Sequence, residues 1–174
     1  MAFTIRDATD DDAGVCAAIY APYVTGTAIT FEYDPPTADE MARRIATAQQ
    51  THAFLVLEED GRVLGYAYAA SVKARAAYDW SCEVSVYLDP AAGRRGGGRA
   101  LYEALFERLA ARGYRQAIAG MTQPNEASAG LHRALGFEPI GVQRRIGWKN
   151  GAWHDVAWVQ RSLTDDDRPP VPLR

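Results

Sequence analysis

The chain has 174 residues, the length of one ordinary domain, and its 48% hydrophobic and 24% charged residues are close to the globular average. This balance excludes disorder over most of the length, and no apolar run approaches the ~18 residues of a membrane-spanning helix. The formal net charge of −3 does not favour a nucleic-acid partner. Two cysteines cannot form a disulfide framework, and residues 1–12 lack the apolar stretch of a signal peptide, so we expect a cytoplasmic protein.

Periodicity and turn residues define the elements that the sequence predicts. In chain order these are a strand over 3–6, a helix capped by Thr9, a helix over 38–48, a hairpin over 53–71, a strand over 82–88, a helix ending at Gly113, a strand over 116–119, a helix over 125–135 and paired strands over 137–142 and 152–163. The central strand–helix–strand unit requires some parallel pairing, whereas the hairpins are antiparallel. The expected fold class is therefore α/β (α+β), with a mixed, mainly antiparallel sheet and helices on both faces.

A glycine-rich turn follows the strand over 82–88. Three consecutive glycines at 96–98 stand among Arg94, Arg95 and Arg99, just before a strongly apolar helical pattern. Glycines let a phosphate approach the backbone, and a helix N-terminus and arginines attract it, so the pattern indicates a pyrophosphate site. A solvated surface turn is the alternative. The turn lacks the Gly-Lys-Ser/Thr of a Walker loop, and Leu101 occupies the last glycine position of a dinucleotide fingerprint.

Residues 94–98 resemble the acyl-CoA loop of the GNAT N-acetyltransferases, although Gly93 replaces the first residue of that motif. Residues 124–128 and 131–137 resemble the second GNAT motif, about 30 residues further on. Residues 73–80 and 147–156 are similar to the branch that acetylates phosphinothricin and methionine sulfoximine. The resemblance covers residues 3–163. It implies a GNAT fold, with one acetyltransferase domain over 1–164, a flexible tail over 165–174, and acetyl-CoA as co-substrate.

Two residues are the catalytic candidates. Glu83 alternates with Cys82 and Val84, and the family places a glutamate here as a general base, acting directly or through water. An exposed glutamate on an edge strand is the alternative. His132 stands where many GNAT enzymes have a tyrosine acid, and a histidine can give or accept a proton near neutral pH. It could be acid, base or orienter, or a half-exposed histidine that closes a pocket.

The resemblance also implies which residues bind acetyl-CoA. The arm of the co-substrate would pair with the exposed strand edge, its phosphates would bind the glycine-rich turn, and an asparagine would line its slot. The candidates are Val86, Tyr87, Leu88, Arg94, Arg95, Gly96, Gly97, Gly98, Arg99 and Asn125. Asn125 is also a good N-cap for the following helix, and both roles can hold together.

Lys73, Arg75, Tyr78 and Phe31 are the substrate-binding candidates. Lys73 and Arg75 could clamp the anionic end of an acidic acceptor, since a guanidinium binds carboxylate or phosphinate in bidentate fashion. Solvated loop charges are the alternative. Phe31 matches an aromatic residue of the acceptor pocket in this branch. The resemblance implies a homodimer whose late hairpin lies near the partner's site. The three histidines and two cysteines are scattered, so we expect no metal.

The sequence thus predicts an N-acetyltransferase that acts on the α-amine of a small acidic amino acid or analogue, such as phosphinothricin or methionine sulfoximine. Another small amine is an alternative acceptor. A catalytically silent acyl-CoA-binding sensor is an alternative of a different class. Glu83 discriminates between them, because a sensor has no use for a carboxylate at that position.

Overall fold

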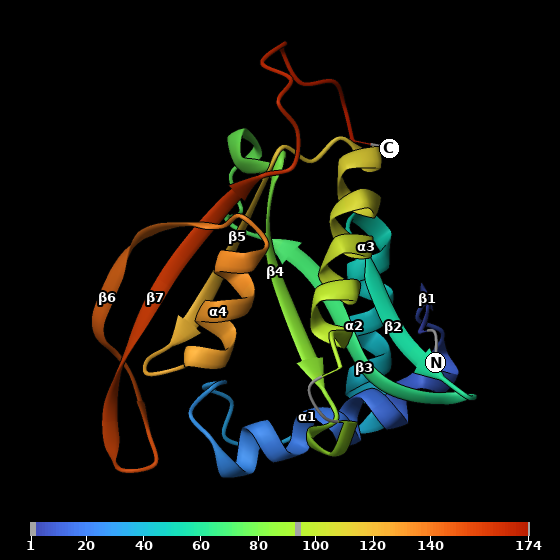
Figure 1. The fold of residues 1–174 in the computed structure, drawn as a ribbon, viewed down its shortest axis with the longest axis vertical. Coiled ribbons are helices and arrows are strands. Elements are labelled where there is room, and N and C mark those ends of the chain that lie inside the picture. Colours follow the sequence, from blue (N-terminus) through green and yellow to red (C-terminus); the bar gives the residue numbers. More distant parts are fainter. Residues whose placement is uncertain (1–2, 93–94, 174) are drawn as a thin grey trace.

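The computed structural model describes residues 3–92 and 95–173. Within them, seven strands form one sheet in the order β1-β2-β3-β4-β5-β7-β6 (Figure 1). The strands are β1 (Thr4–Asp7), β2 (Phe54–Glu59), β3 (Arg62–Ser71), β4 (Ser81–Leu88), β5 (Gln116–Thr122), β6 (Glu138–Lys149) and β7 (Ala152–Ser162). Neighbouring strands are antiparallel except β4 and β5, which run parallel through the α3 crossover.

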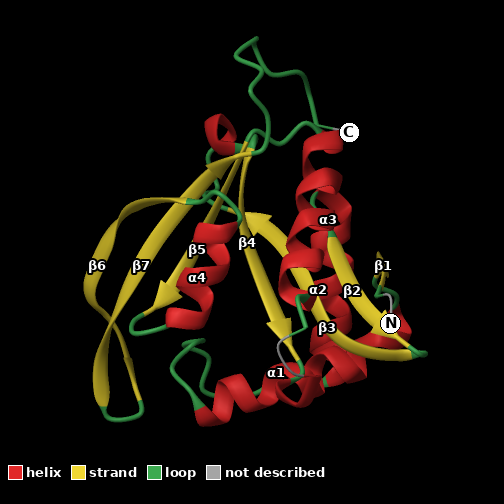
Figure 2. Cartoon of the chain, viewed as in Figure 1, coloured by secondary structure: helices red, strands yellow, loops and turns green. Residues whose placement is uncertain are grey.

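In the described part of the chain, four α-helices cover the two faces of the sheet (Figure 2). Helices α1 (Ala13–Gly26) and α2 (Ala38–Thr51) pack on one face, and α3 (Gly97–Arg112) and α4 (Glu126–Ala134) pack on the other. Local capping explains where helices begin. The Thr37 side chain accepts a hydrogen bond from the Glu40 amide at the start of α2, and Asn125 caps α4 in the same way through Ser128.

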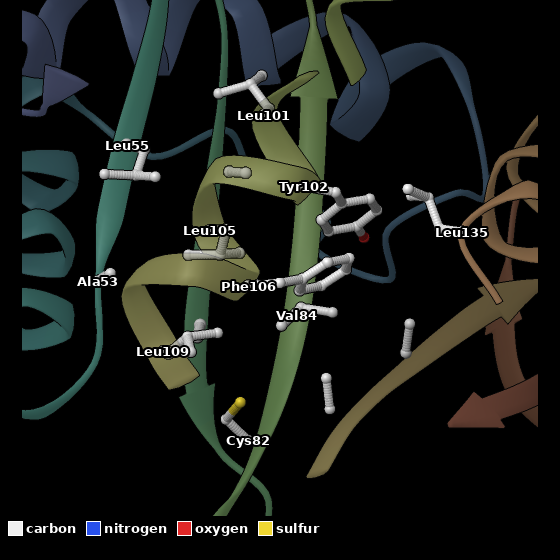
Figure 3. Packing of buried hydrophobic residues seen from close by; sticks show 14 of the residues in the cluster. Ala53, Leu55, Cys82, Val84, Leu101, Tyr102, Leu105, Phe106, Leu109 and Leu135 are labelled. Atoms are coloured by element: carbon white, nitrogen blue, oxygen red, sulfur yellow. The ribbon is translucent and has the colours of Figure 1, made fainter. Parts of the chain in front are cut away.

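The sheet separates two apolar clusters. Leu101, Leu105 and Leu109 of α3 recur at helical spacing, are fully buried, and pack over β2 and β4 (Figure 3). On the other face, aromatic and aliphatic residues of α1 and α2 pack on Phe54 and Tyr66. Cys82 and Val84 of β4 belong to the α3 cluster, whereas Tyr87 contacts the α1 cluster, so β4 alternates between the faces.

The predicted element order and mixed sheet are confirmed, and the largest difference lies in β6. The sequence predicts a strand that ends at residue 142, but β6 continues to Lys149. Its pairing with β7 is interrupted between Gln143 and Gly147, where the register shifts. The glycines and the polar run over 143–145 break the alternation that marks a strand, so sequence reasoning stopped at the bulge.

The C-terminal segment after β7 returns to the body of the domain. The Arg115 guanidinium donates to the backbone carbonyl of Asp166, and the Trp80 indole donates to that of Val171. The flexibility of this tail stays a prediction. Among the described residues, no helix is both long and apolar enough to cross a membrane, and the expected cytoplasmic location also stays a prediction.

Candidate active site

The sheet opens in the middle, and Glu83 stands at the point of opening. Strands β4 and β5 pair at three positions, the last of which is Glu83 opposite Ile118. Beyond it β4 continues to Leu88 and β5 to Thr122, without further pairing between the two. The edge of β4 from residue 84 to 87 that faces β5 therefore keeps backbone groups available for an extended ligand.

A narrow cleft of about 60 Å³ occupies this opening and passes through the sheet. Tyr102 and His132 line it from the α3–α4 side, and Ile29 and Tyr87 line it from the α1 side. Its remaining lining comes from both strand ends and from α4, namely Val84, Ser85, Val86, Gly120, Met121, Thr122, Asn125 and Ser128. The cleft can thus bring together two ligands that enter from opposite faces. Of the residues proposed for the site from the sequence, Val86, Tyr87, Asn125 and His132 line this cleft.

Glu83 immediately precedes the lining residues Val84 and Ser85. By strand alternation its side chain shares the α1–α2 face with Tyr87. Burial raises the pKa of the Glu83 carboxyl above its ordinary value. Across residues 3–92 and 95–173 we find neither a hydrogen bond nor an ion pair to this carboxylate. A desolvated carboxylate without a cationic partner is a good proton acceptor near neutral pH.

His132 is held in one tautomer. It is 3% exposed, and its Nδ1 lies 2.8 Å from the Ser128 carbonyl oxygen, which can only accept a hydrogen bond. Nδ1 therefore carries the proton, and Nε2 accepts from the Tyr102 hydroxyl at 3.3 Å. Burial lowers the pKa of His132, opposed by the Ser128 carbonyl, so the imidazole is neutral at neutral pH. This favours an accepting or orienting role over that of an acid.

The glycine-rich turn forms the start of α3. Gly96 has a φ of 84°, which favours glycine, and precedes the helix as its N-cap. A Cβ on Gly97 would lie 3.3 Å from Leu57, and one on Gly98 would lie 3.4 Å from Leu131. These glycines thus let the N-terminal turn of α3 pack closely on β2 and α4. The first amides of α3 have no partner within the helix and are available to an anion.

The arginines of the turn are in different situations. Arg95 donates to the Glu59 carboxylate at 2.9 Å and to the Ala92 carbonyl at 3.0 Å. Arg99 pairs with Glu103, one turn along α3, at 2.8 Å. The Arg99–Glu103 pair lies on the exposed surface, where ion pairs contribute little, whereas the Glu59 side chain is only 12% exposed. Arg94, together with Gly93, lies outside the described residues.

The substrate candidates occupy two places. Lys73 and Arg75 are exposed on the segment between β3 and β4, and Tyr78 is 40% exposed on the same segment. Phe31 lies on the loop over residues 27–37, which follows α1. Tyr23 of α1 donates to the carbonyl of Leu88 at the far end of β4. The ring of Phe31 packs near that of His154, with centroids 6.1 Å apart, whereas Lys73 and Arg75 lie on the segment that precedes β4.

Sequence reasoning missed two features of this region. Tyr102, which donates to His132, has the apolar helical spacing of a core residue, so nothing in the pattern marks its hydroxyl. A cavity of about 410 Å³ lies between α2 and β3 and is lined by Tyr68, Ala70 and Arg44, among others. Ala70 of β3 is the antiparallel partner of Glu83 on the neighbouring strand β4, so this cavity begins beside the candidate base. Only the three-dimensional pairing reveals it.

Comparisons with known proteins agree on one family. The family model described as "Acetyltransferase (GNAT) domain" matches residues 5–158. A phosphinothricin N-acetyltransferase of Alcaligenes faecalis is 43% identical over 169 residues, 95% of this chain and 85% of that one. An L-methionine sulfoximine/L-methionine sulfone acetyltransferase of Pseudomonas aeruginosa is 34% identical over 165 residues, 94% of this chain and 96% of that one.

Among solved structures, a GNAT superfamily phosphinothricin acetyltransferase from Sinorhizobium meliloti in complex with AcCoA is 38% identical. It superimposes with a TM-score of 0.93 over 98% of this chain and 94% of that chain. The chain therefore belongs to the GNAT family and is an N-acetyltransferase.

Proposed function

We propose that the chain transfers the acetyl group of acetyl-CoA to the α-amine of a small acidic amino acid or analogue, such as phosphinothricin or methionine sulfoximine. The names of the relatives support this acceptor class. The observation that carries the proposal is the position of Glu83, a desolvated carboxylate without a cationic partner among the described residues, at the point where β4 and β5 separate.

The two substrates meet at the opening of the sheet. Acetyl-CoA approaches on the α3–α4 face, with its phosphates at the amides of Gly96, Gly97 and Gly98 and its arm along Val86–Leu88. The acceptor approaches on the face of Glu83. Holding the amine and the thioester in line converts a bimolecular reaction into an effectively unimolecular one, which supplies much of the rate.

The chemistry needs a base, because an ammonium has no lone pair. The Glu83 carboxylate takes a proton from the ammonium, directly or through water, and the amine forms a C–N bond with the thioester carbonyl carbon. A backbone N–H of the open β4 edge donates to the carbonyl oxygen as it gains charge. The C–S bond then breaks, and the second proton of the attacking nitrogen replaces the proton that the thiolate of CoA takes from a protonated group in the cleft. Tyr102, whose hydroxyl is held by neutral His132, supplies a protonated group in the cleft.

The cationic segment supports an acidic acceptor. Lys73 and Arg75 carry positive charges at the end of β4 nearest Glu83. A guanidinium can bind a carboxylate or phosphinate through two parallel hydrogen bonds, which orients the acceptor as well as attracting it. Tyr78 adds an aromatic edge to the same segment, and Phe31 forms the opposite wall.

A homodimer forms through the β6–β7 hairpin. Five large apolar side chains on this hairpin are about half exposed, namely Ile140, Val142, Ile146, Trp148 and Trp153. Val142 and Trp148 pair with Ala157 and Trp153, which share one face of β7, and Trp148 packs edge-on against Trp153 with ring centroids 5.3 Å apart. A contiguous apolar surface of this kind is typical of a protein–protein interface.

The direct test is a thiol-release assay with acetyl-CoA and matched acceptors. We expect CoA release with phosphinothricin and methionine sulfoximine and much slower release with aliphatic amino acids of similar size. Release only with another class of amine would replace the acceptor in this proposal. Binding of acetyl-CoA without release for any acceptor would instead identify a sensor.

A further inference from the structure

A glycine on β6 leaves room for the ring of Phe31. A Cβ built on Gly147 would lie 2.2 Å from Cε2 and 2.3 Å from Cζ of Phe31, where ordinary contacts begin near 3.4 Å. Gly147 has no positive φ, so its backbone conformation does not require glycine. The ring of Phe31, rather than backbone strain, therefore excludes a larger residue at this position.

Lys149, two residues further along β6, holds the same loop by hydrogen bonds. It is 2% exposed, and its Nζ donates to the carbonyls of Val24 and Thr30, each at 2.7 Å. Val24 belongs to the last turn of α1, where carbonyls lack helical partners and a cation is favourable. One ammonium group thus joins the end of α1 to the residue that precedes Phe31.

Further contacts fix the loop from both sides. The Tyr33 hydroxyl donates to the carbonyl of Trp148, between the two β6 residues described above. On the other side, Glu32 accepts from the Arg44 guanidinium at 2.8 and 3.0 Å and from the Tyr20 hydroxyl at 3.0 Å. The β6 contacts come from residues that alternate along one strand, so their spacing is set by the strand itself.

We propose that Gly147 and Lys149 are positioning residues for the acceptor, which set the place of Phe31 at the wall of the acceptor pocket. This inference rests on the proposed function, because it takes Phe31 as part of that pocket. Gly147 determines how close the ring lies to β6, and Lys149 determines where the backbone of the loop lies. Neither residue contacts the reacting atoms; both act through Phe31.

A matched pair of glycine variants tests the role of Gly147. We expect Gly147→Ala to raise KM for the acceptor by about tenfold, because displacements of about 1 Å at a positioning group cost up to 100-fold. KM for acetyl-CoA should stay within about twofold, since the ring lies away from the glycine-rich turn. Gly141→Ala is the control, because it lies on the same strand and its Cβ would meet nothing within 4 Å.

A double-mutant cycle asks whether the effect passes through Phe31. We expect Gly147→Ala to have almost no further effect on acceptor KM in a Phe31→Ala background, because the ring that collides with the new Cβ is gone. Equal effects of Gly147→Ala in both backgrounds would overturn the inference. Equal acceptor KM for Gly147→Ala, Gly141→Ala and wild type would overturn it as well.

Hydrogen exchange of residues 27–37 tests the anchoring without using activity. We expect Lys149→Met and Gly147→Ala to speed exchange of these amides by about tenfold or more, and Gly141→Ala to leave it unchanged. Unchanged exchange in both test variants would show that the loop does not depend on β6. If exchange is faster in the test variants but the wild-type protein acetylates no acceptor, the anchoring of the loop by β6 is supported and the proposed function is contradicted. The two failures are therefore distinguishable.

Discussion

Glu83 and Ile118 form the last pair between the only parallel strands in the described part of the chain, and the sheet opens directly beyond them. The candidate base therefore stands where both faces of the sheet become accessible to each other. Its carboxylate is desolvated, and no described residue forms an ion pair with it. Such a group does not stabilise the fold, which favours a chemical role for it.

The stability of Glu83→Gln tests that statement. Because burial raises the folded-state pKa of Glu83 above its unfolded value, the folded protein binds this proton more tightly. Stability is then lost as the pH rises from the unfolded pKa through the raised folded pKa. We expect Glu83→Gln to melt at a temperature equal to or higher than wild type at pH 7.5, measured by thermal unfolding. A clearly lower melting temperature would indicate a structural carboxylate instead.

Removal of the Arg75 guanidinium should affect acidic acceptors selectively. A hydrogen bond to a charged group contributes about 1.5–3 kcal/mol, so we expect Arg75→Ala to raise KM for phosphinothricin by roughly 10- to 100-fold. Steady-state kinetics with a neutral amino acid of similar size provide the internal control. If both acceptors lose affinity equally, Arg75 does not bind the anionic end.

His132→Gln separates proton transfer from orientation. Glutamine can still donate to the Ser128 carbonyl, but it cannot accept and pass on a proton. If proton movement through His132 matters, kcat should fall by about 100-fold with little change in either KM. Near-wild-type turnover would instead assign His132 a role in orienting Tyr102. In that case Tyr102→Phe should lower kcat more than His132→Gln does.

The hairpin surface predicts the assembly state. We expect Trp148→Glu to convert a dimer into a monomer, because it places a charge in the apolar face of β6 and β7. Light scattering after size-exclusion chromatography measures the mass. Val171→Glu is the control, since Val171 is 58% exposed on the C-terminal segment rather than on the hairpin. A wild-type monomer, or equal loss of dimer in both variants, would remove the hairpin from the interface.

The sequence indicates most of the fold because the residue patterns that mark helices and strands each lie within one short segment of the chain. The apolar spacing of Leu101, Leu105 and Leu109 marks α3, and the alternation around Val84 marks β4. The contacts of Gly147 and Lys149 could not be predicted, because they join β6 to a loop more than 100 residues earlier. The same holds for Ala70, whose place beside Glu83 depends on strand register. Sequence resemblance named Phe31 but gave no account of what holds it.

The turnover number of Glu83→Gln tests the central claim most directly. The change keeps the size of the side chain and removes its ability to take a proton. We expect kcat for acetylation of phosphinothricin to fall by about 100-fold or more, with the Kd for acetyl-CoA within about twofold of wild type. Turnover close to wild type in this variant would contradict the assignment of Glu83 as the general base.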